Sequence, residues 1–324
     1  MADSRDGIIS RLKIDPAGVA IAFTVWILPI VSIEFIWLQL FTPLPLFYYL
    51  VEPGRGRGVN TLAAALLITG LAATASGAAT AFFFLVTMMP AGYMLAAGMA
   101  ANTGPVRTGL GAFIALLLSW WAWSLLYSIS NHAGLYQDIL TSLDQGLIAA
   151  GEAVLVSSEL SAEHAAAFET AIERLGDLIP RIMPGLLLVS LLNVVFLNMI
   201  TGQWLLKRKD PALSSWPPFA EWRLPERMVG VIIAAGIFLL LPGGLLNDTG
   251  LNLILIAGTL YFFQGLAVIN GLLTRWNAPL WILFLSLIFF QVYGIIFLAV
   301  LGLADVWVDF RKKQIESDND KSEE

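Results

Sequence analysis

Long runs of apolar residues follow one another along most of the chain, and polar positions are confined to short stretches between them. Residues 182–206, 250–274 and 278–304 contain no charged side chain. An α-helix rises about 1.5 Å per residue, so roughly 20 apolar residues cross the ~30 Å hydrocarbon layer of a bilayer. A helix that is apolar on every side over such a length is typical of a membrane span. The pattern therefore predicts an all-α, polytopic membrane protein.

The same pattern predicts nine spans, at residues 17–33, 35–51, 60–76, 78–101, 108–130, 182–205, 228–246, 251–274 and 279–304. The first two are the least regular, because Pro29, Glu34 and the TPLP run at 42–45 interrupt them. Closely spaced prolines cannot continue a helix, so this region forms either two short helices or one full helix and a partial one. We expect a transmembrane helical bundle of eight or nine membrane segments, built as one integral membrane domain over residues 1–324.

The composition agrees with a chain whose solvent is mostly lipid. Of its 324 residues, 58% are hydrophobic and only 13% are charged, whereas globular domains carry about 25% charged residues. The net charge is −6, and the charges cluster in a few loops and in the polar ends at 1–16 and 311–324. No basic surface of the kind that binds nucleic acid is expected. The chain has no cysteine, which excludes disulfides, thiolate nucleophiles and cysteine-ligated zinc.

Lysine and arginine in short loops predict the orientation, because they concentrate on the cytoplasmic side. With nine spans, one side receives Arg5, Arg11, Lys13, Arg55, Arg57, Arg107, Lys207, Arg208, Lys209, Arg223, Arg227 and Arg275. We therefore place the N-terminus and the basic loop at 207–227 in the cytoplasm, with the chain in the bacterial cytoplasmic (inner) membrane. Arg311, Lys312 and Lys313 would then fall outside. Either the tail is an exception, or residues 239–253 form a re-entrant hairpin; we favour a cytoplasmic C-terminus.

The loop at 131–179 then lies outside the cell, and it is acidic. It contains eight acidic residues and one arginine, Arg174. Ser161 can cap a helix, and an apolar stripe of Phe168, Ile172, Leu175 and Ile179 follows at helical spacing. A second apolar stripe lies upstream, at residues 139–147. The loop is therefore predicted to be partly helical, either as a lid over a substrate path or as a helical hairpin on the outer membrane face.

Motifs for catalysis and cofactor binding are missing from the sequence. There is no P-loop, and the GRGRG run at 54–58 lacks the spacing and the flanking strand of a dinucleotide-binding loop. The two histidines, His132 and His164, have no metal-ligand spacing. We therefore expect no enzyme, no catalytic residue, no cofactor and no metal.

Polar side chains within the apolar stretches are the candidates for a binding site, because ionisable groups at membrane depth are costly. Glu34 is the strongest of these. Tyr261 and Gln264 are three residues apart and share a helix face, and Asn270 lies six residues further on. Gln264 precedes Gly265, whose exposed backbone would suit a ligand pocket. The alternative for an amide is to bridge two helices. The amides in question are Asn193, Asn198, Gln203, Gln264, Asn270 and Gln291.

Small residues recur at intervals of four and predict close helix packing. The two sets are Ala73, Gly77 and Ala81, and Gly92, Ala96 and Ala100. They serve either internal packing or the docking of a partner membrane subunit.

Four strings support a resemblance to a known family. They are TPLPL at 42–46, WRLPE at 222–226, LYFFQGLAV at 260–268 and GLADVWVDFRK at 302–312. With them the chain resembles the YybS-like family of predicted bacterial membrane proteins (domain of unknown function 2232). The resemblance supplies no catalytic residues. The N-terminal arrangement is also similar to substrate-binding subunits of energy-coupling-factor transporters, which implies docking onto a partner membrane subunit and an ATPase complex.

These observations predict a small-solute transport component in the lipid bilayer, either a binding subunit or a permease, without its own ATPase. Its site would be lined by Glu34, Tyr261, Gln264 and Asn270. The alternative is a non-transporting membrane scaffold that organises envelope partners, and the third possibility is a membrane-embedded enzyme.

Overall fold

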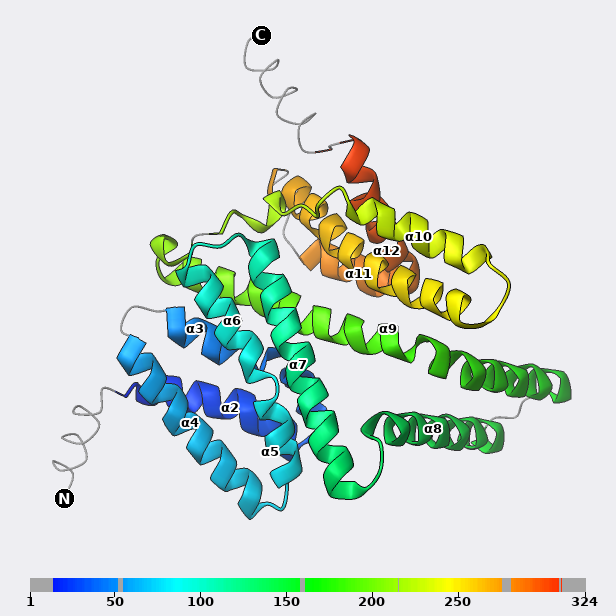
Figure 1. Cartoon of the computed structure of the whole chain (residues 1–324), viewed down its shortest axis with the longest axis horizontal. Helices are drawn as coiled ribbons and strands as arrows, with labels where there is room; N and C mark the ends of the chain where they lie inside the picture. The colour runs from blue at the N-terminus through cyan, green and yellow to red at the C-terminus, as the bar shows by residue number, and fades with distance from the viewer. Residues whose placement is uncertain are drawn as a thin grey trace, which may run out of the picture. The chain divides into compact units, whose positions relative to one another are not determined.

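The structure is a computed structural model that describes residues 14–51, 55–157, 161–214, 216–275, 281–308 and 310; the side chains of Arg55, Ser157, Ala162 and residues 281–291 lie outside the description. Every regular element in these ranges is a helix, so the predicted all-α class is confirmed (Figure 1). The elements are α2 (Pro16–Val31), η1 (Ile33–Phe41), α3 (Leu44–Val51), α4 (Arg55–Ala75), α5 (Ala79–Val86), α6 (Met89–Ala100), α7 (Pro105–Asn131), α8 (Leu135–Ser157), α9 (Ala162–Lys209), η2 (Pro211–Leu213), η3 (Phe219–Glu221), α10 (Met228–Leu240), α11 (Gly244–Arg275) and α12 (Trp281–Val308).

Seven helical segments within the described ranges are long and apolar enough to cross a membrane. They are Ile33–Val51, Gly56–Ala75, Ala79–Ala100, Pro105–Asn131, Leu135–Val156, Glu163–Lys209 and Gly244–Arg275. Three shorter apolar helices are Pro16–Val31, Met228–Leu240 and Val292–Val308. A polytopic bundle is therefore confirmed, but the set of long helices differs from the nine predicted spans: α8 lies in the predicted outer loop, and the helices in the first and seventh predicted spans are short.

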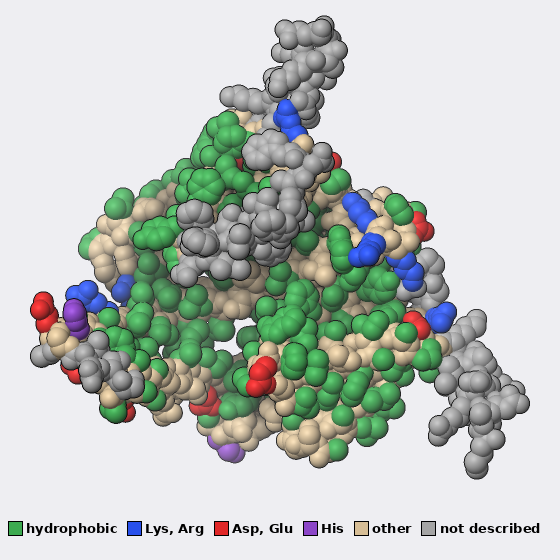
Figure 2. Space-filling view, turned by 180° about the vertical axis from the view of Figure 1, so that it is seen from behind, with side chains coloured by type: hydrophobic (Ala, Val, Ile, Leu, Met, Phe, Trp, Pro, Cys, Tyr) green, Lys and Arg blue, Asp and Glu red, His purple; other side chains and the backbone are tan. Residues whose placement is uncertain are grey.

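Side chains on the surface fit a lipid environment. Figure 2 shows hydrophobic side chains spread widely over the visible face, with charged side chains at only a few places. Helix α7 is the clearest case, because Leu110, Trp121 and Ile129 are each more than half exposed. Large exposed apolar faces of this kind are rare on soluble monomers and mark membrane or partner contact.

The chain divides into two compact units, which helix α9 joins. The first unit is Met1–Leu135 with Ser190–Trp216, and the second is Tyr136–Val189 with Pro217–Glu324. Within the first, α2 packs on α4, α3 on α6, and α6 on α7. Within the second, α11 packs on both α10 and α12.

The predicted break near the N-terminus occurs at two points. Helix α2 continues past Pro29 to Val31 and ends at Ser32, whose backbone is extended. The 3-10 helix η1 follows, and a turn at Thr42 and Pro43 separates it from α3. Pro45 falls in the first turn of α3, where a proline is tolerated because its missing N–H has no helical partner there.

Residues 239–253, where the sequence allowed a re-entrant hairpin as one alternative, contain the end of α10, a short turn and the start of α11; whether this segment crosses the membrane fully stays a prediction. Helices α10 and α11 form a helical hairpin whose short turn holds Gly243, with φ +59°, at the start of α11. Left-handed backbone of this kind favours glycine, and α11 is helical from Gly244 onward. Helix α10 has 13 residues, about 20 Å at 1.5 Å per residue.

Helix α9 is the second departure from prediction. It has 48 residues and runs without interruption from the predicted outer loop through the sixth predicted span, in spite of Pro180 and Pro184. The acidic first turn and the basic last turn complement the helix dipole at each end. The helical content predicted for the loop at 131–179 is confirmed by α8 and by the first third of α9.

Candidate functional site

Gln264 and Asp305 form the most deeply buried polar pair in the described part of the second unit. The side chains of Gln264 and Asp305 are only 5% and 2% exposed. The Gln264 amide nitrogen Nε2 donates a hydrogen bond to Asp305 Oδ2 at 3.1 Å, and its oxygen Oε1 accepts one from the Leu224 backbone N–H at 3.0 Å. The amide therefore joins α11 to α12 and to the WRLPE loop that precedes α10.

Two glycines allow this pair to form. A Cβ atom at Gly265 would overlap the Leu298 carbonyl of α12, and one at Gly302 would overlap the Tyr261 carbonyl of α11. Helix backbones that meet without intervening side chains pack by close van der Waals contact. Gly302 lies one turn before Asp305, so the crossing sets the position of the carboxylate next to Gln264.

The expectation that Gly265 offers an exposed backbone to a ligand is therefore wrong. Gly265 is buried, and the α12 backbone covers it. Its role is to let α12 approach.

Tyr261 lies one turn before Gln264 on α11 and is 1% exposed. Its hydroxyl has no hydrogen-bond partner among the described residues. A buried hydroxyl of this kind is free to bond to a small molecule or to water.

The other predicted site residues lie in different surroundings. Asn270 is half-buried on α11, and its backbone carbonyl accepts a bond from the Thr274 hydroxyl. Glu34 is exposed in the first turn of η1, in the other unit, and accepts a hydrogen bond from the Ser32 hydroxyl. The structure brings Tyr261 and Gln264 together; that Glu34 and Asn270 contact the same solute stays a prediction.

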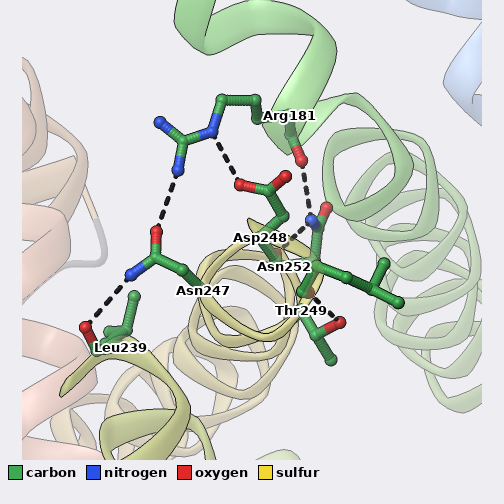
Figure 3. A network of polar contacts seen from close by, with 7 residues as sticks. Arg181, Leu239, Asn247, Asp248, Thr249 and Asn252 are labelled. Carbon is green, nitrogen blue, oxygen red and sulfur yellow. Dashed lines mark hydrogen bonds and ion pairs between the residues drawn. The ribbon is translucent and has the colours of Figure 1, made fainter. Parts of the chain in front are cut away.

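A second polar cluster joins α9 to α11 within the second unit (Figure 3). Arg181 Nε donates to Asp248 Oδ1 at 2.6 Å, and Arg181 Nη2 donates to Asn247 Oδ1 at 2.8 Å. The Asn247 amide in turn donates to the Leu239 carbonyl at 3.0 Å, near the end of α10, where carbonyls lack helical partners. Arg181 therefore links α9 to α11, and Asn247 links α11 to α10.

Asn252 holds α9 at its proline-rich segment. Its Nδ2 donates to the Arg181 carbonyl at 2.8 Å, and its Oδ1 accepts from the Gly185 N–H. These are the two groups that pair in an i to i+4 helical bond. A Cβ at Gly185 would lie 2.6 Å from Asn252 Oδ1, so glycine is required for this approach. The amide supports α9 where Pro184 cannot donate a bond.

Of the two sets of small residues expected to form packing faces, only part of one set packs as predicted. Gly92 and Ala96 are buried in α6, and a Cβ at Gly92 would overlap the Pro43 carbonyl. Ala100 is exposed. Ala73 lies in α4 and Ala81 in α5, while Gly77 lies in the turn between them, with φ +77°. These three residues therefore do not share one helix face.

The predicted outer loop forms a pocket of about 210 Å³ between α8 and α9, lined by Leu140, Thr141, Asp144, Leu147, Gly176, Ile179 and Pro180. Ligand pockets usually measure about 300–1,000 Å³, so this one is small for a solute site. Among the described residues, no group of three or more His, Asp or Glu side chains is arranged to hold a metal ion.

Asp305 is the residue that sequence reasoning missed. The ninth predicted span ended at residue 304, so the carboxylate fell one residue outside it. The signal was present, because Asp305 is followed by Val306, Trp307 and Val308, which extend the apolar pattern past the acid. Arg181 and Asp248 were missed for a related reason: each lies at the edge of a predicted span.

An all-helical fold with apolar helices of this length defines a multi-pass membrane protein. A family model described as "Predicted membrane protein (DUF2232)" matches residues 19–306, and the chain belongs to this family. The resemblance to this family found in the sequence is thus confirmed. No curated protein and no solved structure matches the chain.

Proposed function

We propose that the protein is a small-solute transport component of the bacterial cytoplasmic membrane, either a binding subunit or a permease, and that Asp305, Gln264 and Tyr261 contact the solute. The main support for this proposal is that the Asp305 carboxylate is buried. A carboxylate inside an apolar helix pair is expensive to maintain and usually marks a pathway for a substrate, ion or proton. Structural packing alone does not require an acid at this position, since an apolar or amide side chain would fill the space at a lower desolvation cost.

The surroundings of Asp305 support a role in binding. The Gln264 amide is fixed at its other end by the Leu224 backbone, so it holds the carboxylate in one orientation. The buried Tyr261 hydroxyl, on the same face of α11 as Gln264, adds a hydrogen-bonding group without a protein partner in the described ranges. A carboxylate, an amide and a hydroxyl together suit a solute that is cationic or rich in hydrogen-bond donors.

The test is native purification of the full chain in mild detergent, followed by mass spectrometry of bound small molecules and proteins. We compare wild type with Asp305→Asn, Gln264→Ala and, as control, Glu221→Gln, which alters an exposed acid of the same unit. We expect a small molecule with wild type and Glu221→Gln that is lost from the other two variants. A small molecule retained equally by all four proteins contradicts the site.

The co-purifying proteins separate the transporter from the scaffold. A membrane subunit with an attached ATPase supports the binding-subunit form of the proposal. Recovery of an envelope protein but no small molecule contradicts transport and favours the scaffold.

A further inference from the structure

The first unit contains a buried polar break between η1 and α3, at the predicted TPLP run, whose polar groups the solute site does not use. The break contains Thr42 and Pro43, Leu40 lies just before it near the end of η1, and side chains of α2 and α9 bond to this segment. Trp26 of α2 donates its Nε1–H to the Thr42 carbonyl at 3.0 Å. Asn198 of α9 donates its Nδ2–H to the Leu40 carbonyl at 2.7 Å. Two backbone carbonyls of this segment are therefore bonded by the preceding helix α2 and by α9, which lies 158 residues further along the chain.

Two side-chain oxygens at this break have no hydrogen-bond partner among the described residues. They are Thr42 Oγ1 and Asn198 Oδ1, and both side chains are 0% exposed. Buried polar atoms are nearly always paired, because leaving them unpaired is costly. Turning the Asn198 amide over does not help, since Nδ2 already faces two carbonyls, those of Leu40 and Val194.

The chemistry of the break suits a cation. The oxygens it offers are a hydroxyl, an amide carbonyl and the backbone carbonyls of Leu40 and Thr42, each of which keeps a second lone pair. All of them are neutral, which fits a monovalent ion better than a divalent one, because divalent ions take carboxylates. The break also lies at the C-terminal end of η1, where the helix dipole favours positive charge. Unwound backbone at a helix discontinuity is a recurring site for Na⁺ in membrane proteins.

We propose that Thr42 Oγ1 and Asn198 Oδ1, with the carbonyls of the η1–α3 break, bind a Na⁺ ion. The ion pairs two otherwise unsatisfied oxygens and fixes the break against α9. The proposal does not depend on the solute site, because that site uses other residues in the other unit.

Thr42→Val tests the proposal with little change in shape, since valine replaces the hydroxyl by a methyl group and leaves the backbone bonds intact. The matched control is Thr69→Val. Thr69 is also 0% exposed, but its hydroxyl is already paired with the Ala65 carbonyl at 2.8 Å. The measurement is thermal unfolding of the full chain in detergent, in NaCl, KCl and choline chloride of equal ionic strength.

We expect NaCl to raise the midpoint of wild type and Thr69→Val above that in choline chloride, by about 2–4 °C at a tenfold excess over Kd. Thr42→Val should show no such shift, and in choline chloride it should be at least as stable as wild type. Binding of radioactive Na⁺ to wild type, competed by NaCl but not by choline chloride, is the second measurement and does not rely on the variants. An equal midpoint in all three salts, as a bound water molecule would give, overturns the proposal. So does a K⁺ effect equal to that of Na⁺, or a full Na⁺ shift in Thr42→Val.

Discussion

Two glycines decide how closely α11 and α12 approach, and thereby where the buried Gln264 and Asp305 side chains meet. At Gly265 and Gly302, the backbone of each helix occupies the space that a methyl group on the other would need. The polar pair and the crossing are therefore one structural feature. A change at either glycine should act on the site through helix separation, without altering a polar atom.

Gly302→Ala is expected to lower the stability of the protein by about 1–3 kcal/mol, as overpacking does, and to weaken solute binding. The matched control is Gly258→Ala on α11, where a new Cβ meets nothing within 4 Å. That control should be neutral or stabilising, because alanine favours helix over glycine. Thermal unfolding in detergent measures both variants. Equal stability of Gly302→Ala and Gly258→Ala would show that the helices do not meet at this point.

Asp305 and Gln264 are expected to respond differently to mutation. Asp305→Asn removes the cost of burying a charge and keeps an oxygen for the Gln264 amide, so stability should hold or rise. Gln264→Leu leaves the Leu224 N–H without this acceptor and should cost about 1–3 kcal/mol. Chemical or thermal unfolding compares the two. If Asp305→Asn were the more damaging of the pair, the carboxylate would be a structural group and its proposed role in binding would lose its basis.

At the scale of elements, α9 is held by α11 at the segment where its own hydrogen bonding is weakest. Pro180 and Pro184 remove two donors from the helix, and Asn252 bonds to both the Arg181 carbonyl and the Gly185 N–H. The sequence did not predict a continuous α9, because two prolines and a change from acidic to apolar composition are typical of a boundary. The helix continues because a side chain 67 residues away supports it, which local pattern cannot indicate.

Asn252→Ala is expected to loosen α9 around Gly185. Amide hydrogen exchange at residues 181–186 should rise well above that of wild type, since the external support is lost. Thr249→Ala is the control on the same helix, because among the described residues the Thr249 hydroxyl bonds to the Leu245 carbonyl of α11 itself, at 2.7 Å. Unchanged exchange in Asn252→Ala would mean that α9 does not need the amide.

At the scale of the whole molecule, the apolar pattern and its length predicted the class of the protein. The helix boundaries and the polar contacts between helices could not be predicted in this way. Runs without charge, such as 250–274, were enough to predict helices and membrane insertion. The boundary errors at Asp305 and Arg181 have one cause: polar residues at the edge of an apolar run are typical of a loop, while in the structure both lie inside helices. Asp305 bonds to Gln264 and Arg181 to Asp248, both on α11. Gln264 could be singled out from its apolar surroundings, but its hydrogen bond to Asp305 could be found only in the structure.

The membrane topology can be tested at the two ends of α9. Its 48 residues measure about 72 Å at 1.5 Å per residue, more than twice the ~30 Å hydrocarbon layer. The apolar part begins at residue 182, so the acidic first third should project from the membrane. If α8 rests outside the bilayer, as the distribution of lysine and arginine predicts, residue 167 is outside the cell and residue 212 is in the cytoplasm.

The chain has no native cysteine, so single introduced cysteines report on one position each. Ala167 and Ala212 are both exposed, which makes Ala167→Cys and Ala212→Cys a matched pair. A membrane-impermeant maleimide should label the first variant in intact spheroplasts and the second only after permeabilisation. The reverse result would contradict the predicted orientation of α9.

The central claim is that the buried Asp305 carboxylate contacts a small solute. The most direct measurement is equilibrium binding of the compound recovered from the native protein, by calorimetry, to wild type, Asp305→Asn and Glu221→Gln. Loss of a charge-assisted contact should weaken binding at least ~10-fold, or about 1.4 kcal/mol, in Asp305→Asn, while Glu221→Gln keeps the affinity of wild type. Equal affinity of all three proteins would contradict the claim.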